Sequence, residues 1–189
     1  MMKIIDLTVS YGDKPVLDRI SLEIGDGITC IMGDSGRGKT TLLRCIAGLV
    51  KPDSGEIVNP PRRPAFMFQE DRLFPWLNAL ENVKAVCDDE EKARKLLKEV
   101  EVELEEHLNK MPSELSGGMK RRVALARTLG FDSDLIILDE PFKGLDEALT
   151  SRIAALIREK AAHVPVLVAT HAESDVDMLG AEKIELNKH

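Results

Sequence analysis

The chain has 189 residues, of which 43% are hydrophobic and 31% charged, so it has room for one domain, alone or with a small appended lobe. No stretch approaches the roughly 18 uninterrupted apolar residues that span a bilayer, and the N-terminus lacks a signal-peptide pattern, so we expect a cytoplasmic location. The formal net charge of −7 argues against general affinity for nucleic acid, and three scattered cysteines argue against a disulfide framework or a zinc site.

The first part of the chain predicts antiparallel strands. Residues 3–9 alternate apolar and polar side chains, and after a turn at 11–15 the alternation resumes over 16–24. The apolar run 28–32 is short, continuous and bounded by glycines. Such a run is typical of a strand that is covered on both faces, as in a parallel sheet.

The middle of the chain predicts a helix at 40–49, two strands at 56–58 and 65–68 around a proline-rich turn, and a charged helical stretch at 79–108. We interpret the charges of this stretch as a solvated face.

The last part of the chain alternates helices with apolar strands. Its elements are a loop at 111–115, a helix at 119–130, a strand at 135–138, a helix at 149–161 and a strand at 164–169. This alternation predicts an α/β fold with a mainly parallel sheet, right-handed crossovers and an N-terminal antiparallel β patch. We expect one domain over 1–189, with a core formed by 1–71 and 115–189 and an inserted helical lobe at 72–114.

A glycine-rich loop joins the strand at 28–32 to the helix that follows. It fits the pattern G-x-x-x-x-G-K-[ST], in which glycines let successive N–H groups point at one anion and the helix adds its positive end. Lys39 can reach the β- and γ-phosphates, and the Thr40 hydroxyl can ligate Mg²⁺. The predicted nucleotide-binding residues are Gly33, Asp34, Ser35, Gly36, Arg37, Gly38, Lys39, Thr40 and Thr41. The alternative is a plain glycine turn with Lys39 on the surface.

Titratable residues stand at the ends of two apolar strands. Asp139 follows the strand at 135–138 and is placed to hold Mg²⁺, and Glu140 can polarise the attacking water as a general base. His171 follows the strand at 164–169, where it can hydrogen-bond the γ-phosphate. The alternative is that all three are ordinary polar residues at strand exits.

A further motif, Leu115-Ser116-Gly117-Gly118-Met119, resembles the signature of the nucleotide-binding domain of ATP-binding cassette (ABC) proteins. The other motifs stand in the order of that family, and the resemblance covers essentially the whole chain. It implies a P-loop NTPase core that hydrolyses ATP to ADP and phosphate. The basic run 120–122 after the motif is interpreted as a solvated face and has no catalytic role.

The resemblance also implies roles for single residues. Tyr11 matches the aromatic residue that stacks on adenine, and Gln69 matches the glutamine that senses Mg²⁺ and links the core to the lobe. Asp146 matches an acid that communicates across a dimer interface, and His171 matches the switch histidine. The implied catalytic residues are Lys39, Gln69, Glu140 and His171, and the implied metal ligands are Thr40, Gln69 and Asp139.

The signature residues Ser116, Gly117 and Gly118 would bind the γ-phosphate held by the opposite subunit. The start of the helix after Ser116 offers amides for a second anion site. ATP would then close a head-to-tail dimer with two-fold symmetry, and hydrolysis would release it.

The segment 68–77 is similar to that of ATPases serving nitrate, sulfonate and taurine importers. Its Phe74, Pro75 and Trp76 form an apolar edge that could receive a cytoplasmic helix of a membrane subunit; the alternative is packing within the lobe. The segments around the lobe are shorter than usual for these importers, which affects docking more than the catalytic set.

These similarities imply an ATPase on the inner face of the cell membrane. Its partners would be ATP with Mg²⁺, integral membrane permease subunits, a second copy of the chain and a substrate-binding protein, with no nucleic acid. The alternatives are a soluble ABC-type ATPase in DNA repair, chromosome structure or translation, and a non-catalytic nucleotide-gated binding module. The sequence does not name the transported substrate, because in proteins of this design the membrane and capture subunits choose it.

Overall fold

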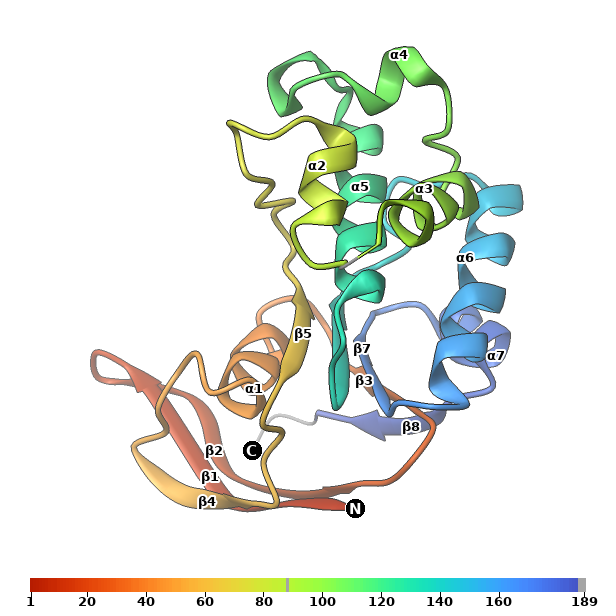
Figure 1. Ribbon diagram of the computed structural model, residues 1–189. Coiled ribbons are helices and arrows are strands. Elements are labelled where there is room, and N and C mark those ends of the chain that lie inside the picture. The colour runs from red at the N-terminus through yellow and green to blue at the C-terminus, as the bar shows by residue number, and fades with distance from the viewer. Residues whose placement is uncertain (88, 187–189) are drawn as a thin grey trace.

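The computed structural model describes residues 1–87 and 89–186 (Figure 1). Each predicted site residue lies within these ranges. Residue 88 of the predicted lobe and residues 187–189 of the predicted core lie outside them.

A three-stranded antiparallel sheet forms the N-terminal part, at the lower left of Figure 1. Its strands β1 (Met2–Tyr11), β2 (Lys14–Ile24) and β4 (Ser54–Val58) have the order β2-β1-β4. Ile4, Leu7 and Val9 of β1 face the core and are almost fully buried, because the pairing with β2 shifts between Ile4 and Leu7 and so interrupts the alternation read from the sequence.

A five-stranded sheet, parallel at every pairing, forms the centre, with the order β5-β6-β7-β3-β8. Its strands are β3 (Ile28–Met32), β5 (Pro64–Met67), β6 (Leu135–Asp139), β7 (Val166–Ala169) and β8 (Glu182–Glu185). The sequence did not predict β8 or the helix α7 (Glu173–Leu179) before it. β8 is an edge strand of Glu-Lys-Ile-Glu in which only Ile184 is half-buried, so it lacks an apolar pattern.

Helices cover both faces of the parallel sheet. Successive residues of β6 face opposite sides: Leu135 and Ile137 pack with α1 (Lys39–Ile46) and the antiparallel sheet. Ile136 and Leu138 pack in a second core with α6 (Glu147–Ala161), α7 and the lobe. Strands buried on both faces carry no alternation, which explains the continuous apolar runs in the sequence. The predicted fold class is confirmed.

The predicted helical stretch 79–108 contains three helices. These are α2 (Ala79–Lys84), α3 (Glu90–Glu99) and α4 (Glu105–Leu108), at the top of Figure 1. Side chains of Asn78 and Asp89 cap α2 and α3 and so mark new helix starts. The predicted loop at 111–115 contains a short 3₁₀ helix, η1 (Pro112–Glu114).

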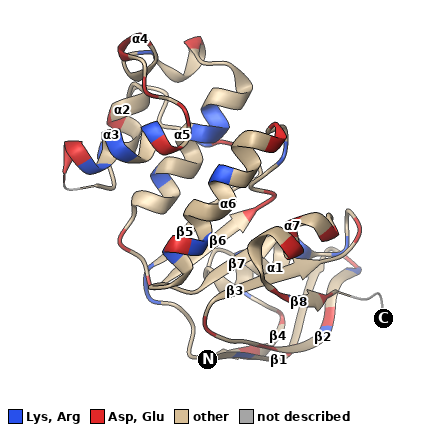
Figure 2. Ribbon diagram, turned by 90° about the vertical axis from the view of Figure 1, so that its right-hand side faces the viewer, with Lys and Arg blue, Asp and Glu red and all other residues tan. Residues whose placement is uncertain are grey.

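Helix α5 (Gly117–Gly130) joins the lobe to the core, since α2 and α3 pack on it and its C-terminus leads into β6. Basic and acidic residues are interspersed along the helices of this region (Figure 2). Among the described helices, none is both long and apolar enough to span a membrane. The division of the chain at residues 72 and 114 stays a prediction.

Candidate functional site

The glycine-rich loop leads from β3 into α1, and its last glycine cannot be replaced without strain. Gly38 precedes the first residue of α1 with a φ of 88°. A Cβ atom at Gly38 would lie 2.7 Å from Leu17 Cδ2 and 2.9 Å from Val16 O. The loop is therefore held tightly against β2, with the N-terminal amides of α1 at its end.

Lys39 lies across this loop and is largely buried. Its ammonium donates hydrogen bonds to the carbonyl oxygens of Gly33 and of Asp34, the latter at 3.0 Å. Arg37 is held beside them by an ion pair with Asp34, at 3.0 Å. The loop thus presents a positive charge at the end of a helix, which is the arrangement that binds phosphate.

Thr40 and Asp139 are 99 residues apart in sequence and adjacent in space. The Thr40 hydroxyl donates a hydrogen bond of 2.7 Å to Asp139 Oδ2. Burial raises the pKa of Asp139, although the hydrogen bond from Thr40 acts in the opposite direction. A hydroxyl and a carboxylate in contact offer the hard oxygen ligands that Mg²⁺ prefers, so these residues fit that ion.

Glu140 is the centre of a second group of contacts. It has a positive φ of 52°. Glu140 Oε2 lies 3.1 Å from Lys143 Nζ and 3.5 Å from Gln69 Nε2, and Glu140 Oε1 lies 3.6 Å from His171 Nδ1. Burial raises the pKa of Glu140, but Lys143, His171 and Lys39 together hold it below its ordinary value.

Two cavities flank the loop. One, of about 250 Å³, is lined by Val16, Ser35, Gly36, Gly38, Lys39, Thr40, Thr41, Gln69, Asp139 and Glu140. The other, of about 280 Å³, is lined by Met32, Gly33, Asp34, Arg37, His171, Glu185 and Leu186. The fold therefore brings the predicted loop, acid, glutamine and histidine residues to one edge of the parallel sheet.

Other predicted site residues lie apart from these cavities. Tyr11 ends β1, is 54% exposed and belongs to neither lining. Ser116 caps α5 by accepting a hydrogen bond of 3.2 Å from Met119 N. Asp146 caps α6 in the same way, accepting from Leu149 N at 2.9 Å.

One interpretation of the basic run 120–122 was wrong, because Arg121 is buried, with 8% of its surface exposed. Its guanidinium donates to the backbone carbonyls of Gln69 (3.0 Å), Asp139 (3.0 Å) and Glu140. Burial lowers the pKa of Arg121, against the effect of nearby carboxylates. The sequence signal that could have found it is helical spacing: Arg121 shares a face of α5 with Leu125 and Thr128, which are also buried.

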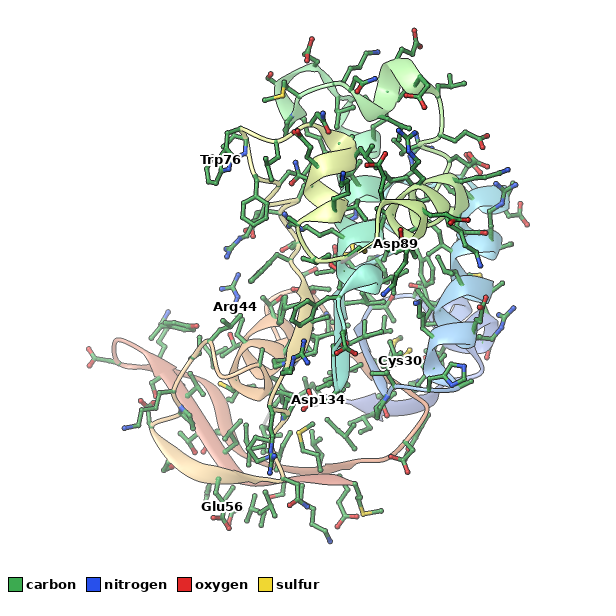
Figure 3. All side chains as sticks on the ribbon, viewed as in Figure 1. Cys30, Arg44, Glu56, Trp76, Asp89 and Asp134 are labelled. Carbon is green, nitrogen blue, oxygen red and sulfur yellow. The ribbon has the colours of Figure 1, made fainter. Side chains whose placement is uncertain are left out.

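The apolar edge of the lobe is partly exposed. Trp76 is 68% exposed and Phe74 38%, with their ring centroids 5.6 Å apart. Trp76 projects from the side of the lobe (Figure 3). The buried Asn82 fixes this turn, since its amide accepts from Phe74 N at 2.8 Å and donates to three backbone carbonyls.

Comparison with known proteins adds to this geometry. The model of the ABC transporter family matches residues 17–143. The aliphatic sulfonates import ATP-binding protein SsuB 3 of Paraburkholderia xenovorans is 43% identical over 174 residues, which cover 88% of this chain and 68% of that protein. SsuB 1 of Nocardia farcinica is 39% identical over 192 residues, which cover 99% of this chain and 78% of that protein.

Among solved structures, the chain is similar to the dimeric structure of MJ0796, described as a bacterial ABC transporter cassette. The TM-score is 0.87 with 29% identity, and the match covers 98% of this chain and 95% of that one. A second structure of the same cassette, a dimer in a post-hydrolysis state bound to ADP and Pi, has a TM-score of 0.84 with 29% identity, covering 99% and 94%.

Proposed function

This chain belongs to the ABC transporter family, and we propose that it is the subunit of a sulfonate-type importer that binds and hydrolyses ATP to drive transport. The observation that carries this proposal is the contact of Thr40 with Asp139. It brings the phosphate loop and the acidic end of β6 to one cavity, which Lys39 and Glu140 also line. The alternative, a soluble cassette ATPase in DNA repair or translation, is not favoured by these relatives, which are import proteins by name.

Nucleotide binding would depend on the loop. The amides that begin α1 and the Lys39 ammonium would hold the β- and γ-phosphates, and Tyr11 would stack on the adenine at the edge of the antiparallel sheet. Thr40 and Asp139, with Gln69 beside them, would hold Mg²⁺, which when bound neutralises charge on the phosphate oxygens.

Hydrolysis would use the group of contacts around Glu140. Its carboxylate accepts a proton from the water that attacks the γ-phosphorus, while the bond from phosphorus to the bridging β,γ-oxygen breaks and ADP leaves. A glutamate carboxyl is ordinarily ionised at neutral pH, and Lys143, His171 and Lys39 lower the pKa of Glu140 further. Gln69 and His171 contact Glu140 from two sides, and His171 would donate to the γ-phosphate.

A second copy of the chain would complete the site. Gly117 and Gly118 lie at the exposed start of α5, and a Cβ atom at either would meet nothing within 4 Å. The fold of one chain therefore does not require glycine here, which fits a close approach by a phosphate held on another copy. Asp146, at the start of α6, would lie at the same interface.

The exposed Trp76 and Phe74 would receive a cytoplasmic helix of a membrane subunit. This contact would hold the chain at the inner face of the membrane. A substrate-binding protein on the other side would deliver the solute.

The direct test is the rate of ATP hydrolysis. We expect Glu140→Gln to lower kcat by about 100- to 10,000-fold with little change in ATP affinity, because the general base is lost and the phosphate loop is intact. Equal rates for wild type and Glu140→Gln would contradict the proposed role of Glu140. Lys39→Ala, in contrast, should weaken ATP binding itself.

The importer assignment has a separate test. We expect the chain to co-purify with a hydrophobic membrane subunit, and we expect Trp76→Ser to lose this association.

A further inference from the structure

We propose that Arg121 is a positioning residue that ties the start of α5 to the backbone of the three residues that surround the γ-phosphate. The inference rests on the proposed function, since it assigns Arg121 to the same site. Arg121 is five residues beyond Ser116, on the first turns of α5, and it points from that helix into the core.

The contacts of Arg121 are specific to the site. Nη1 donates to the carbonyl of Gln69 at 3.0 Å, and Nη2 donates to the carbonyls of Asp139, at 3.0 Å, and of Glu140. The side chains of all three residues line the nucleotide cavity. By holding the three carbonyls, Arg121 therefore fixes the backbone positions from which these side chains extend.

Two of the three carbonyls belong to residues just past the ends of strands, although Glu140 N still donates to Ala169 O of β7 at 2.9 Å. β5 ends at Met67 and β6 ends at Asp139, so Gln69 and Glu140 lie beyond the last strand residues. A planar guanidinium with paired donors can bridge two such segments at once, which an ammonium cannot do in the same geometry.

Burying the guanidinium of Arg121 costs free energy, and the need to fill this space does not account for that cost. The Nε atom of Arg121 is buried and has no hydrogen-bond partner among residues 1–87 and 89–186, and the carboxylate of Asp71 is 3.9 Å from Nη1, too far for a close ion pair. An apolar side chain would fill the space without burying a charge or leaving a donor unpaired. What the guanidinium provides is the link among the three carbonyls.

The link has a consequence for the proposed dimer. Helix α5 starts at the signature residues, which act on the nucleotide of the other copy, while Arg121 holds the residues that act on this chain's own nucleotide. A shift of Gln69 or Glu140 on hydrolysis would therefore pull on the start of α5. Loss of Arg121 should uncouple the two sites as well as slow each of them.

The matched control is Arg122, the next residue of the same helix. Its Nη1 also donates to backbone carbonyls, those of Val100 (3.3 Å) and Glu101 (3.1 Å), but these lie in the lobe and belong to no residue of the cavity. Arg122→Met therefore removes a guanidinium with similar bonds from α5 without touching the site.

The experiment measures kcat and KM for ATP hydrolysis, the Kd for a fluorescent ATP analogue and the thermal unfolding midpoint in wild type, Arg121→Met, Arg121→Lys and Arg122→Met. We expect Arg121→Met to lower kcat by about 100-fold, because misplacing a reacting group by about 1 Å has that effect. The Kd should stay within about twofold, since Arg121 does not contact the phosphate loop. The kcat of Arg121→Lys should lie between those of wild type and Arg121→Met, and Arg122→Met should keep the wild-type kcat.

Equal kcat values for Arg121→Met and Arg122→Met would overturn the proposal. So would a parallel loss of kcat and ATP affinity, which a merely structural role produces. If Arg121→Met does not fold, Arg121→Lys decides by the same comparison of kcat with Kd. If wild type and Glu140→Gln hydrolyse ATP equally, the proposed function fails; if they differ while Arg121→Met behaves as wild type, only this inference fails.

Discussion

Two glycine-rich segments of this chain differ in how the fold uses them. In the phosphate loop, Gly38 has a positive φ and its missing Cβ leaves room for Val16 and Leu17 of β2. At the start of α5, Gly117 and Gly118 have open space around them. The first glycine is required by the chain's own packing, whereas the other two are not. This difference fits the proposed division of the site, in which the phosphate loop is one half and the start of α5 acts on the nucleotide of another copy.

The largest expected effect comes from filling that open space with charge. Gly117→Asp should lower kcat by about 100- to 1000-fold, because a carboxylate would replace donors at the γ-phosphate with a repulsive charge. The affinity of the isolated chain for ATP should not change, since its own loop is intact. Ser113→Asp, which adds the same charge at an exposed position of η1, is the control for both measurements. Reduced affinity in Gly117→Asp alone would contradict the division into two halves.

In the phosphate loop, by contrast, we expect a substitution to lower both the stability of the chain and its affinity for ATP. Gly38→Ala should lower the free energy of unfolding by about 2 kcal/mol, because the new Cβ is strained at this φ and overlaps β2. ATP affinity should fall with it. Chemical denaturation and an ATP titration check both, and an unchanged midpoint would show that the loop is less constrained than its packing indicates.

At the start of α5, a substitution of glycine by alanine should change the free energy of unfolding by less than in the phosphate loop and with the opposite sign. Gly118→Ala should raise the free energy of unfolding by about 0.5 kcal/mol, because alanine loses less backbone entropy in a helix and nothing obstructs its Cβ. ATPase activity should nevertheless fall. A variant that is more stable and fully active would remove the reason for a glycine at this surface.

The smallest effect concerns thiol reactivity beneath the phosphate loop. Burial raises the pKa of Cys45, on α1, to about 11, and that of Cys30, on β3, to about 12. Both thiols therefore stay protonated at pH 8, and we expect alkylation only after local opening. Mg-ATP should slow the alkylation of Cys45 a few-fold, because ligand binding stabilises the closed form of the loop it follows. An unchanged rate of Cys45 alkylation at saturating Mg-ATP would show that binding does not stabilise α1.

The sequence predicted the parts of the fold and site that local pattern controls. Continuous apolar runs predicted β3, β6 and β7, and the ends of these strands predicted the positions of Asp139, Glu140 and His171. Parallel pairing brings these ends to one edge, so local patterns were sufficient to predict that the site residues meet.

Elements and residues that depend on tertiary contacts were missed. β8 is polar and pairs in parallel with β3, a contact that its own sequence pattern does not show. Arg121 looks like its charged neighbours in sequence; its helical spacing with Leu125 and Thr128 was the available signal, and the packing of α5 against β5 shows that it is buried. Lys143 was also assigned no role, although it is exposed and its 3.1 Å contact with Glu140 joins residues only three apart in sequence.

The most direct measurement mixes two inactive variants. Lys39→Ala has a defective phosphate loop and an intact signature. Gly117→Asp has an intact phosphate loop and a defective signature. In a mixed dimer, the loop of one chain and the signature of the other form one intact site, so the mixture should hydrolyse ATP at up to about a quarter of the wild-type rate. A mixture no more active than the sum of the two variants measured apart would contradict a nucleotide shared between two copies of this chain.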